Sequence, residues 1–147
     1  KEFIPGDEEA RKSVAGACVK QLLDATGGCL FALTTGLQHW RLFEWLDAAT
    51  GEQRTPDEWM EAGRRIQTAR AAFGTREKKA DAGKDRARDY ALANPRIYGE
   101  PPLERGPLAG NTVPLVAMVA GYRKEFGWDE RTGVPLPETM ERLGVRV

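Results

Sequence analysis

The sequence predicts an all-α, multihelical single domain, and three observations lead to this prediction. Apolar residues recur at steps of three and four in several separate stretches, as they do on the buried face of a helix. Glycine, proline and capping residues stand at the ends of these stretches. No stretch of convincing length alternates apolar and polar side chains as a half-buried strand does. Because 147 residues suit one hydrophobic core, we expect one domain over residues 1–147.

The first helix is expected to begin near Asp7, a residue type that caps helix N-termini. It is expected to end at Gly27 and Gly28, because glycine adopts left-handed backbone conformations without a steric penalty. Its buried stripe is predicted from apolar residues at four-residue steps, namely Val14, Cys18 and Leu22. On this stripe Cys18 is most simply a core residue.

A second helix is predicted over roughly 38–49, where apolar side chains recur at every third position: Trp40, Phe43, Leu46 and Ala49. We therefore expect this helix to be largely buried. His39, the one histidine of the chain, stands at its start. It is assigned no catalytic or ligand role, because a lone histidine there is more often a surface or capping residue.

A third helix of about 18 residues starts with a capping box, Thr55-Pro56-Asp57-Glu58. Its predicted apolar face comprises Trp59, Ala62, Ile66, Ala69 and Phe73. The opposite face, which carries Glu61, Arg64, Arg65 and Arg70, is expected to be solvated unless another domain covers it.

The C-terminal half begins with a charge-rich stretch at 76–90, which we interpret as mobile or exposed. Four prolines and three glycines between Asn94 and Gly110 predict a long Pro/Gly-rich surface loop. A helix capped by Asn111 or Thr112 should then run to Phe126, and a short last helix should cover 137–143.

Composition excludes several classes of function. The 22 basic and 22 acidic residues give a net charge of +0, which indicates neither a nucleic-acid footprint nor a membrane-binding surface. No apolar run approaches the length of a membrane span. Two cysteines do not form a disulfide scaffold, so we expect a reduced, intracellular setting and a cytoplasmic location.

The candidate site is the segment from Asp24 to Leu30, which places a carboxylate, two glycines and Cys29 close together. One interpretation is a helix cap followed by a small buried cysteine; the other is a cofactor loop. Two Cys and one His exclude a closed zinc site within the chain. The glycines are not followed by the Lys-Ser/Thr of a P-loop, and no spacing pairs Cys29 with a catalytic base. There remain a free redox thiol and a cysteine that supplies one ligand to a metal cluster.

The motif Asp24-x-x-Gly27-Gly28-Cys29-Leu30 resembles the Asp-x-x-Gly-Leu-Cys-x pterin-binding motif of the tungsten- or molybdenum-dependent aldehyde ferredoxin oxidoreductase family. Gly28 stands where that motif usually has Leu. Further segments resemble the family in the same order, from about Asp7 to Leu143: Ala49-Thr50-Gly51, Thr55–Trp59 with Gly63–Ile66, Arg70–Glu77, Glu100–Pro107, Tyr122, Gly127-Trp128-Asp129 and Thr132–Pro135.

The resemblance implies that residues 1–147 are the C-terminal helical domain of such an enzyme, whose cofactors are a 4Fe–4S cluster and a tungstopterin or molybdopterin. It implies that Cys29 is the fourth cluster ligand, beside three cysteines of a preceding domain. Asp24 would accept hydrogen bonds from the pterin. Gly27 and Gly28 would let the backbone approach the cofactor, in a loop that includes Leu30.

The reaction implied by the resemblance is oxidation of an aldehyde to a carboxylic acid, with electrons passing through the cluster to ferredoxin or a similar carrier. The partners are then the remaining domains of the same enzyme. No catalytic residue can be named in this segment, and alone it is expected to be inactive. The alternative is a helical interaction module that kept the fold and lost the chemistry. The choice of metal, aldehyde and electron acceptor is set outside this chain.

Overall fold

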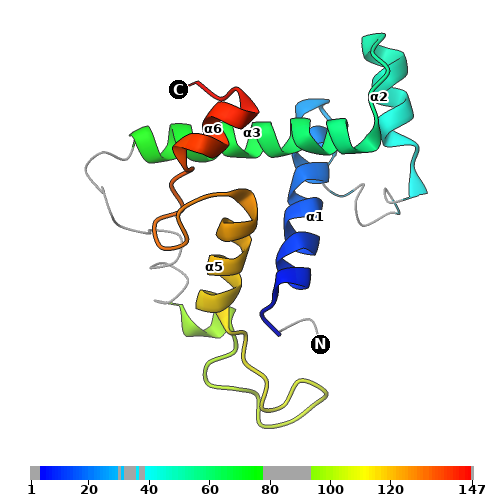
Figure 1. The fold of residues 1–147 in the computed structure, drawn as a ribbon. Coiled ribbons are helices and arrows are strands. Elements are labelled where there is room, and N and C mark those ends of the chain that lie inside the picture. The colour runs from blue at the N-terminus through cyan, green and yellow to red at the C-terminus, as the bar shows by residue number, and fades with distance from the viewer. Residues whose placement is uncertain (1–3, 30, 32–35, 37–38, 78–93, 147) are drawn as a thin grey trace.

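The computed structural model describes residues 4–29, 31, 36, 39–77 and 94–146, and over these ranges it is all-α, as predicted (Figure 1). No β-strand occurs in the described ranges. The α-helices are α1 (Asp7–Ala25), α2 (Leu42–Thr50), α3 (Pro56–Glu77), α5 (Leu115–Phe126) and α6 (Pro137–Leu143), and one 3-10 helix, η4 (Pro95–Ile97), precedes α5. Most of the charge-rich stretch at 76–90 lies outside the described residues.

The longest helix, α3, is the element on which the others are arranged. In Figure 1, α1 runs across α3, α5 lies at the side of α1, and α6 lies against α3. The crossing of α1 and α3 is set by Gly63, which is buried. A Cβ atom at this position would stand only 2.4 Å from the carbonyl oxygen of Cys18. The absence of a side chain therefore lets the two backbones touch.

The main core cluster lies where α1, α3 and α5 meet. Val14 and Cys18 of α1 pack there with Phe126 and Trp128, whose rings stack with centroids 4.5 Å apart. The indole N–H of Trp128 donates to the hydroxyl of Thr68 in α3 at 3.3 Å. The interpretation of Cys18 as a core residue is thus confirmed.

The segment that follows α5 is a compact turn, and it explains the Gly-Trp-Asp…Thr-Gly-x-Pro pattern structurally. Trp128 forms an isolated antiparallel bridge with Pro135. The buried guanidinium of Arg123 donates to the carbonyl oxygens of Glu130 and Arg131, at 3.2 and 3.0 Å. These contacts hold the turn against α5 and keep Trp128 in the core.

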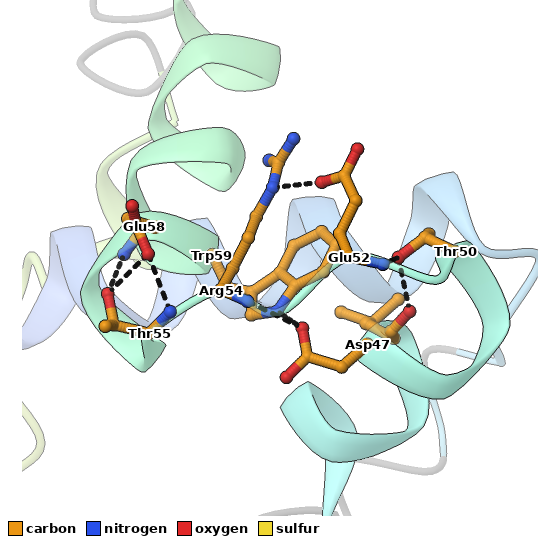
Figure 2. A network of polar contacts seen from close by, with 8 residues as sticks. Asp47, Thr50, Glu52, Arg54, Thr55, Glu58 and Trp59 are labelled. Atoms are coloured by element: carbon orange, nitrogen blue, oxygen red, sulfur yellow. Dashed lines mark hydrogen bonds and ion pairs between the residues drawn. The ribbon is translucent and has the colours of Figure 1, made fainter.

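The corner between α2 and α3 is held by a polar network (Figure 2). Asp47 Oδ1 accepts from the indole N–H of Trp59 at 2.8 Å and from the backbone N–H of Arg54 at 3.1 Å. The predicted capping box is confirmed, because Glu58 accepts from the Thr55 N–H at 2.7 Å and Thr55 Oγ1 accepts from the Glu58 N–H at 3.3 Å. The corner fixes Trp59, which packs on Leu22 in the last turns of α1.

The prediction that the second helix is largely buried is wrong. In α2, Leu46 is buried against Leu22 and Trp59, and Phe43 is half-buried. Trp45 is 54% exposed, and Trp40, whose ring centroid lies 5.9 Å from that of Trp45, is 42% exposed. Regular spacing identified the helix, but α2 contacts its neighbours along one narrow edge. The helix also begins at Leu42, later than predicted.

The predicted faces of α3 also need correction. Phe73 is 53% exposed, whereas Gly63, Thr68 and Ala72 are buried. A close helix crossing selects small residues, which a search for large apolar side chains does not find. The opposite face is not simply solvated either, since Arg64 lies over the Phe126 ring and donates to the carbonyl oxygen of Glu125 at 2.7 Å.

The remaining elements follow the predictions more closely. The Pro/Gly-rich segment is an exposed irregular loop apart from η4, and α6 ends at Leu143 as expected. Helix α5 begins at Leu115 rather than near Thr112. Pro114 explains the delay, because the residue before a proline is disfavoured in helical conformation.

Candidate functional site

The candidate loop begins at the C-terminus of α1, which ends in a Schellman motif. The N–H of Gly28 donates to the carbonyl oxygen of Leu23 at 2.9 Å, and the N–H of Gly27 donates to that of Asp24 at 3.2 Å. Gly27 has φ +77°, a left-handed conformation that favours glycine. The predicted helix cap at the two glycines is therefore confirmed.

Gly28 lies tightly against the end of its own helix. A Cβ atom at Gly28 would stand 2.1 Å from Cδ1 of Leu23 and 3.0 Å from the Leu23 carbonyl oxygen. The Leu23 side chain, which is itself buried, thus fills the space next to the turn. The cap is closed and well supported without a side chain at position 28.

Cys29 follows the cap directly, and its side chain is free and exposed. The interpretation of a small buried cysteine is wrong for this residue, although it holds for Cys18. Burial raises the pKa of the Cys18 thiol, which further reduces its nucleophilic thiolate form. Of the two cysteines, Cys29 is the one available to a ligand or a reagent.

The Asp24 carboxylate, in the last turn of α1, is about one-third exposed and lies between two cations. Lys20 Nζ approaches its Oδ2 at 2.5 Å, one helical turn earlier. Arg70 Nη1 of α3 lies 4.0 Å from the same oxygen. The same Arg70 nitrogen donates to the side-chain oxygen of buried Gln21 at 2.6 Å.

The fold thus brings together Asp24, Gly27, Gly28 and Cys29 at the end of one helix. Leu30, also predicted to belong to the site, lies outside the described residues, while the next described residue, Phe31, is 73% exposed. Within the described ranges, no group of three or more His, Cys, Asp or Glu side chains could hold a metal ion. The described part of the loop therefore offers one exposed thiol and one carboxylate.

Sequence reasoning missed the polar partners of Asp24. The i, i+4 spacing of Lys20 and Asp24 on a helix was a signal that could have found the first ion pair. Arg70 is far away in the sequence, and only the crossing of α1 and α3 brings it to Gln21 and Asp24. His39, which was assigned no role, is exposed.

Comparison with known protein families gives a match along nearly the whole chain. A family model described as "Aldehyde ferredoxin oxidoreductase, domains 2 & 3" matches residues 2–145. That range includes the helix cap, Cys29 and the compact turn after α5. In the described ranges, no helix has the length and apolar character needed to cross a bilayer.

Curated relatives agree with the family match. A tungsten-containing aldehyde ferredoxin oxidoreductase of Pyrococcus furiosus is 34% identical over 139 residues, which is 95% of this chain and 22% of the relative. The protein of the same description from Thermococcus kodakarensis is 33% identical over 139 residues, with the same coverage. The chain thus spans about a fifth of the length of the curated relatives it matches.

Proposed function

This chain belongs to the aldehyde ferredoxin oxidoreductase family, and we propose that residues 1–147 form the C-terminal helical domain of an enzyme that oxidises aldehydes to carboxylic acids. The chain corresponds to about a fifth of its relatives, so the partners belong to the proposal as well. They are the remaining domains of the same enzyme, an aldehyde substrate, and ferredoxin or a similar electron carrier. A cytoplasmic location is part of the same proposal, and the free thiols of Cys18 and Cys29 support it.

In this proposal the loop after α1 is one wall of the cofactor site. Cys29 supplies one thiolate ligand to a 4Fe–4S cluster, because cysteine thiolates are the usual ligands of cluster iron. Asp24 accepts hydrogen bonds from N–H groups of a pterin, as an ionised carboxylate can. Gly27 and Gly28 allow close approach of the backbone, and Leu30 continues the loop.

The observation that carries the proposal is the exposure of Cys29 directly after a rigid helix cap. Free cysteines are among the most buried residues of proteins, so an exposed one is unusual. Here it follows Asp24 by five positions, in a chain that matches the family over residues 2–145. The Schellman motif fixes the path of the backbone into Cys29, which a ligand residue requires.

The Cys29 thiol and the Asp24 carboxylate are only part of the donor set that such a cofactor needs. This is expected for a site that is shared with other domains. One thiol and one carboxylate cannot complete a cluster, so the other cluster ligands come from the remaining domains in this proposal. When bound, the tungsten or molybdenum pterin would supply the two-electron oxidation and the cluster a path for single electrons. The residues of this chain bind and orient these groups, and none of them is assigned as a catalytic acid or base.

The test is the change Cys29→Ala in the full-length protein, with Cys18→Ala as the matched control. Loss of a cluster ligand should lower iron content, remove the broad visible absorbance of the cluster and abolish aldehyde oxidation. Cys18→Ala should keep the iron, because Cys18 is buried in the core at the α1–α3 crossing. Unchanged iron content in Cys29→Ala would refute the ligand role.

A second candidate function is a non-catalytic helical interaction module that retains the fold only. Glycine at position 28, where the family motif usually has Leu, favours this candidate. The two candidates differ in the cofactor content of the full-length wild-type protein. After anaerobic purification, stoichiometric iron and pterin support the enzyme, whereas their absence supports the module.

A further inference from the structure

Arg70 joins the middle of α3 to the last turns of α1, at the point where the candidate loop begins. Its guanidinium donates to the Gln21 side chain at 2.6 Å and lies 4.0 Å from Oδ2 of Asp24. Gln21 is only 5% exposed, so the acceptor that holds Arg70 is itself fixed in the fold. Arg70 Nη1 is therefore held by Gln21, and the same nitrogen faces the Asp24 carboxylate.

A second cation, Lys20, approaches the same carboxylate oxygen. It lies on α1, one turn before Asp24, and its ammonium is 2.5 Å from Oδ2. In the part of the chain that the structure describes, both ion pairs of Asp24 are thus made through Oδ2. Two cations on one oxygen hinder rotation of the carboxylate, and Oδ1 takes part in neither of these ion pairs. Oδ1 can then serve as the acceptor for a ligand.

We infer that Arg70 is a positioning residue that, together with Lys20, holds the Asp24 carboxylate in the orientation in which it accepts hydrogen bonds from the pterin. The inference rests on the proposed function, because it needs Asp24 to contact the pterin. Arg70 itself is not assigned a contact with the cofactor. It acts through Gln21 and Asp24.

A purely structural role is the competing explanation, and the exposure of these side chains argues against it. The Arg70 side chain is 62% exposed, Lys20 37% and Asp24 33%. Ion pairs this accessible to water contribute little to folding stability. Removing the outer-shell partner of a metal ligand lowers metal affinity by roughly 10- to 100-fold, and we expect a partner that orients a pterin-binding carboxylate to act in the same way.

The experiment uses the full-length enzyme loaded with its cofactors, and it measures how fast bound pterin is released on warming. Pterin release is followed by fluorescence, and iron content and helix unfolding are measured in parallel. Arg70→Gln should release pterin roughly 10-fold faster than wild type at an unchanged unfolding temperature. Arg70→Lys, which keeps the charge but not the planar fork, should be intermediate. Arg65→Gln removes an exposed arginine of the same helix and should match wild type.

A double variant tests whether Arg70 acts through Asp24. Asp24→Asn should release pterin faster than wild type, and adding Arg70→Gln to it should cause no further change. Independent, multiplying effects of the two changes would overturn the positioning role. So would a wild-type release rate in Arg70→Gln while Asp24→Asn is impaired. If Asp24→Asn itself releases pterin at the wild-type rate, the proposed pterin contact of Asp24 fails, and the inference falls with it.

Discussion

At the scale of single residues, Gly27 and Gly28 have reasons to be glycine that involve no cofactor. Gly27 has φ +77°, and the space beside Gly28 is filled by the Leu23 side chain. In a Schellman motif, an apolar residue at the position of Gly28 normally packs on the helical residue at the position of Leu23. The Leu of the family motif would thus pack against the residue that covers Gly28 here. Glycine at this position leaves the cap intact.

The two thiols should differ sharply in reactivity in the native chain. Cys29 is exposed, whereas Cys18 is 2% exposed and burial raises the pKa of its thiol. A thiol-specific alkylating reagent at neutral pH should therefore modify one cysteine per chain rapidly and the second only on unfolding. Mass spectrometry of the modified chain identifies the residue.

Serine variants serve as controls for this assignment. Cys29→Ser should abolish the fast phase of alkylation, and Cys18→Ser should retain it. Rapid modification of both cysteines in the folded chain would contradict the packing of Cys18 against Gly63.

The residues that surround Asp24 show how far the site could be predicted. The loop residues Asp24 to Cys29 were identified from a local motif, and Lys20 could have been found from helical spacing. Arg70 and Gln21 could not, because their contact depends on the angle at which α1 crosses α3. A motif identifies the residues that are close in sequence, whereas the fold determines the groups that orient them.

At the scale of elements, the helix ends marked by a complete local motif were predicted better than the helix faces. The capping box at Thr55 and the glycines after α1 are local signals, and both were confirmed. Burial depends on what packs against a helix. The spacing of residues along one helix carries no information about its neighbours. Thus α2 has the regular spacing of a buried helix, yet Trp45 is exposed.

The crossing of α1 and α3 can be tested with two glycines of the same helix. In Gly63→Ala, the added methyl would stand 2.4 Å from the Cys18 carbonyl oxygen, so the helices must separate. We expect the free energy of unfolding to fall by about 1–3 kcal/mol. Gly74→Ala adds a methyl group with no atom within 4 Å and should raise it by about 0.5–1 kcal/mol. Urea unfolding measures both, and equal effects of the two changes would contradict the close crossing.

The capping box should make the stability of α3 depend on pH. Hydrogen bonds from the Thr55 N–H and hydroxyl lower the pKa of the Glu58 carboxyl below its ordinary value of 4.5. A carboxyl with a lower pKa in the folded state contributes stability that is present above pH 4.5 and lost as pH falls through the folded pKa. Glu58→Gln should therefore lower the unfolding temperature more at pH 7 than at acid pH.

Thermal unfolding followed by circular dichroism, at pH 7 and at steps below pH 4.5, measures this effect. Glu104→Gln, in the exposed Pro-rich loop, is the matched control. A deficit in Glu58→Gln that is the same at every pH would show that the ionised carboxylate is not what caps the helix.

At the scale of the whole molecule, the described surface is uneven in its apolar exposure. Phe31, Trp40, Trp45 and Phe73 all have exposed rings, while Trp59 and Trp128 are buried. Large exposed apolar side chains that lie close together mark interaction surfaces more often than exposed apolar side chains that stand alone. Trp40 and Trp45 qualify, because their ring centroids are 5.9 Å apart and one narrow edge attaches α2 to the body.

The last prediction concerns these tryptophans and tests the proposed dependence on the remaining domains. In the 147-residue chain, iodide should quench Trp40 and Trp45 and spare Trp59 and Trp128, which are 6% and 7% exposed. Trp45→Phe should remove part of the quenchable emission with little change in unfolding temperature, since exposed substitutions have small effects on stability.

In the full-length enzyme, we expect the quenchable share of the emission from these four residues to fall, because the remaining domains would cover the α2 surface. Comparing the full-length protein with its Trp45→Phe variant isolates the signal of Trp45 from tryptophans elsewhere. An iodide response of Trp45 as large in the complete protein as in the short chain would mean that this surface stays open. The burial of α2 predicted from its spacing would then be wrong in the complete protein as well as in the isolated chain.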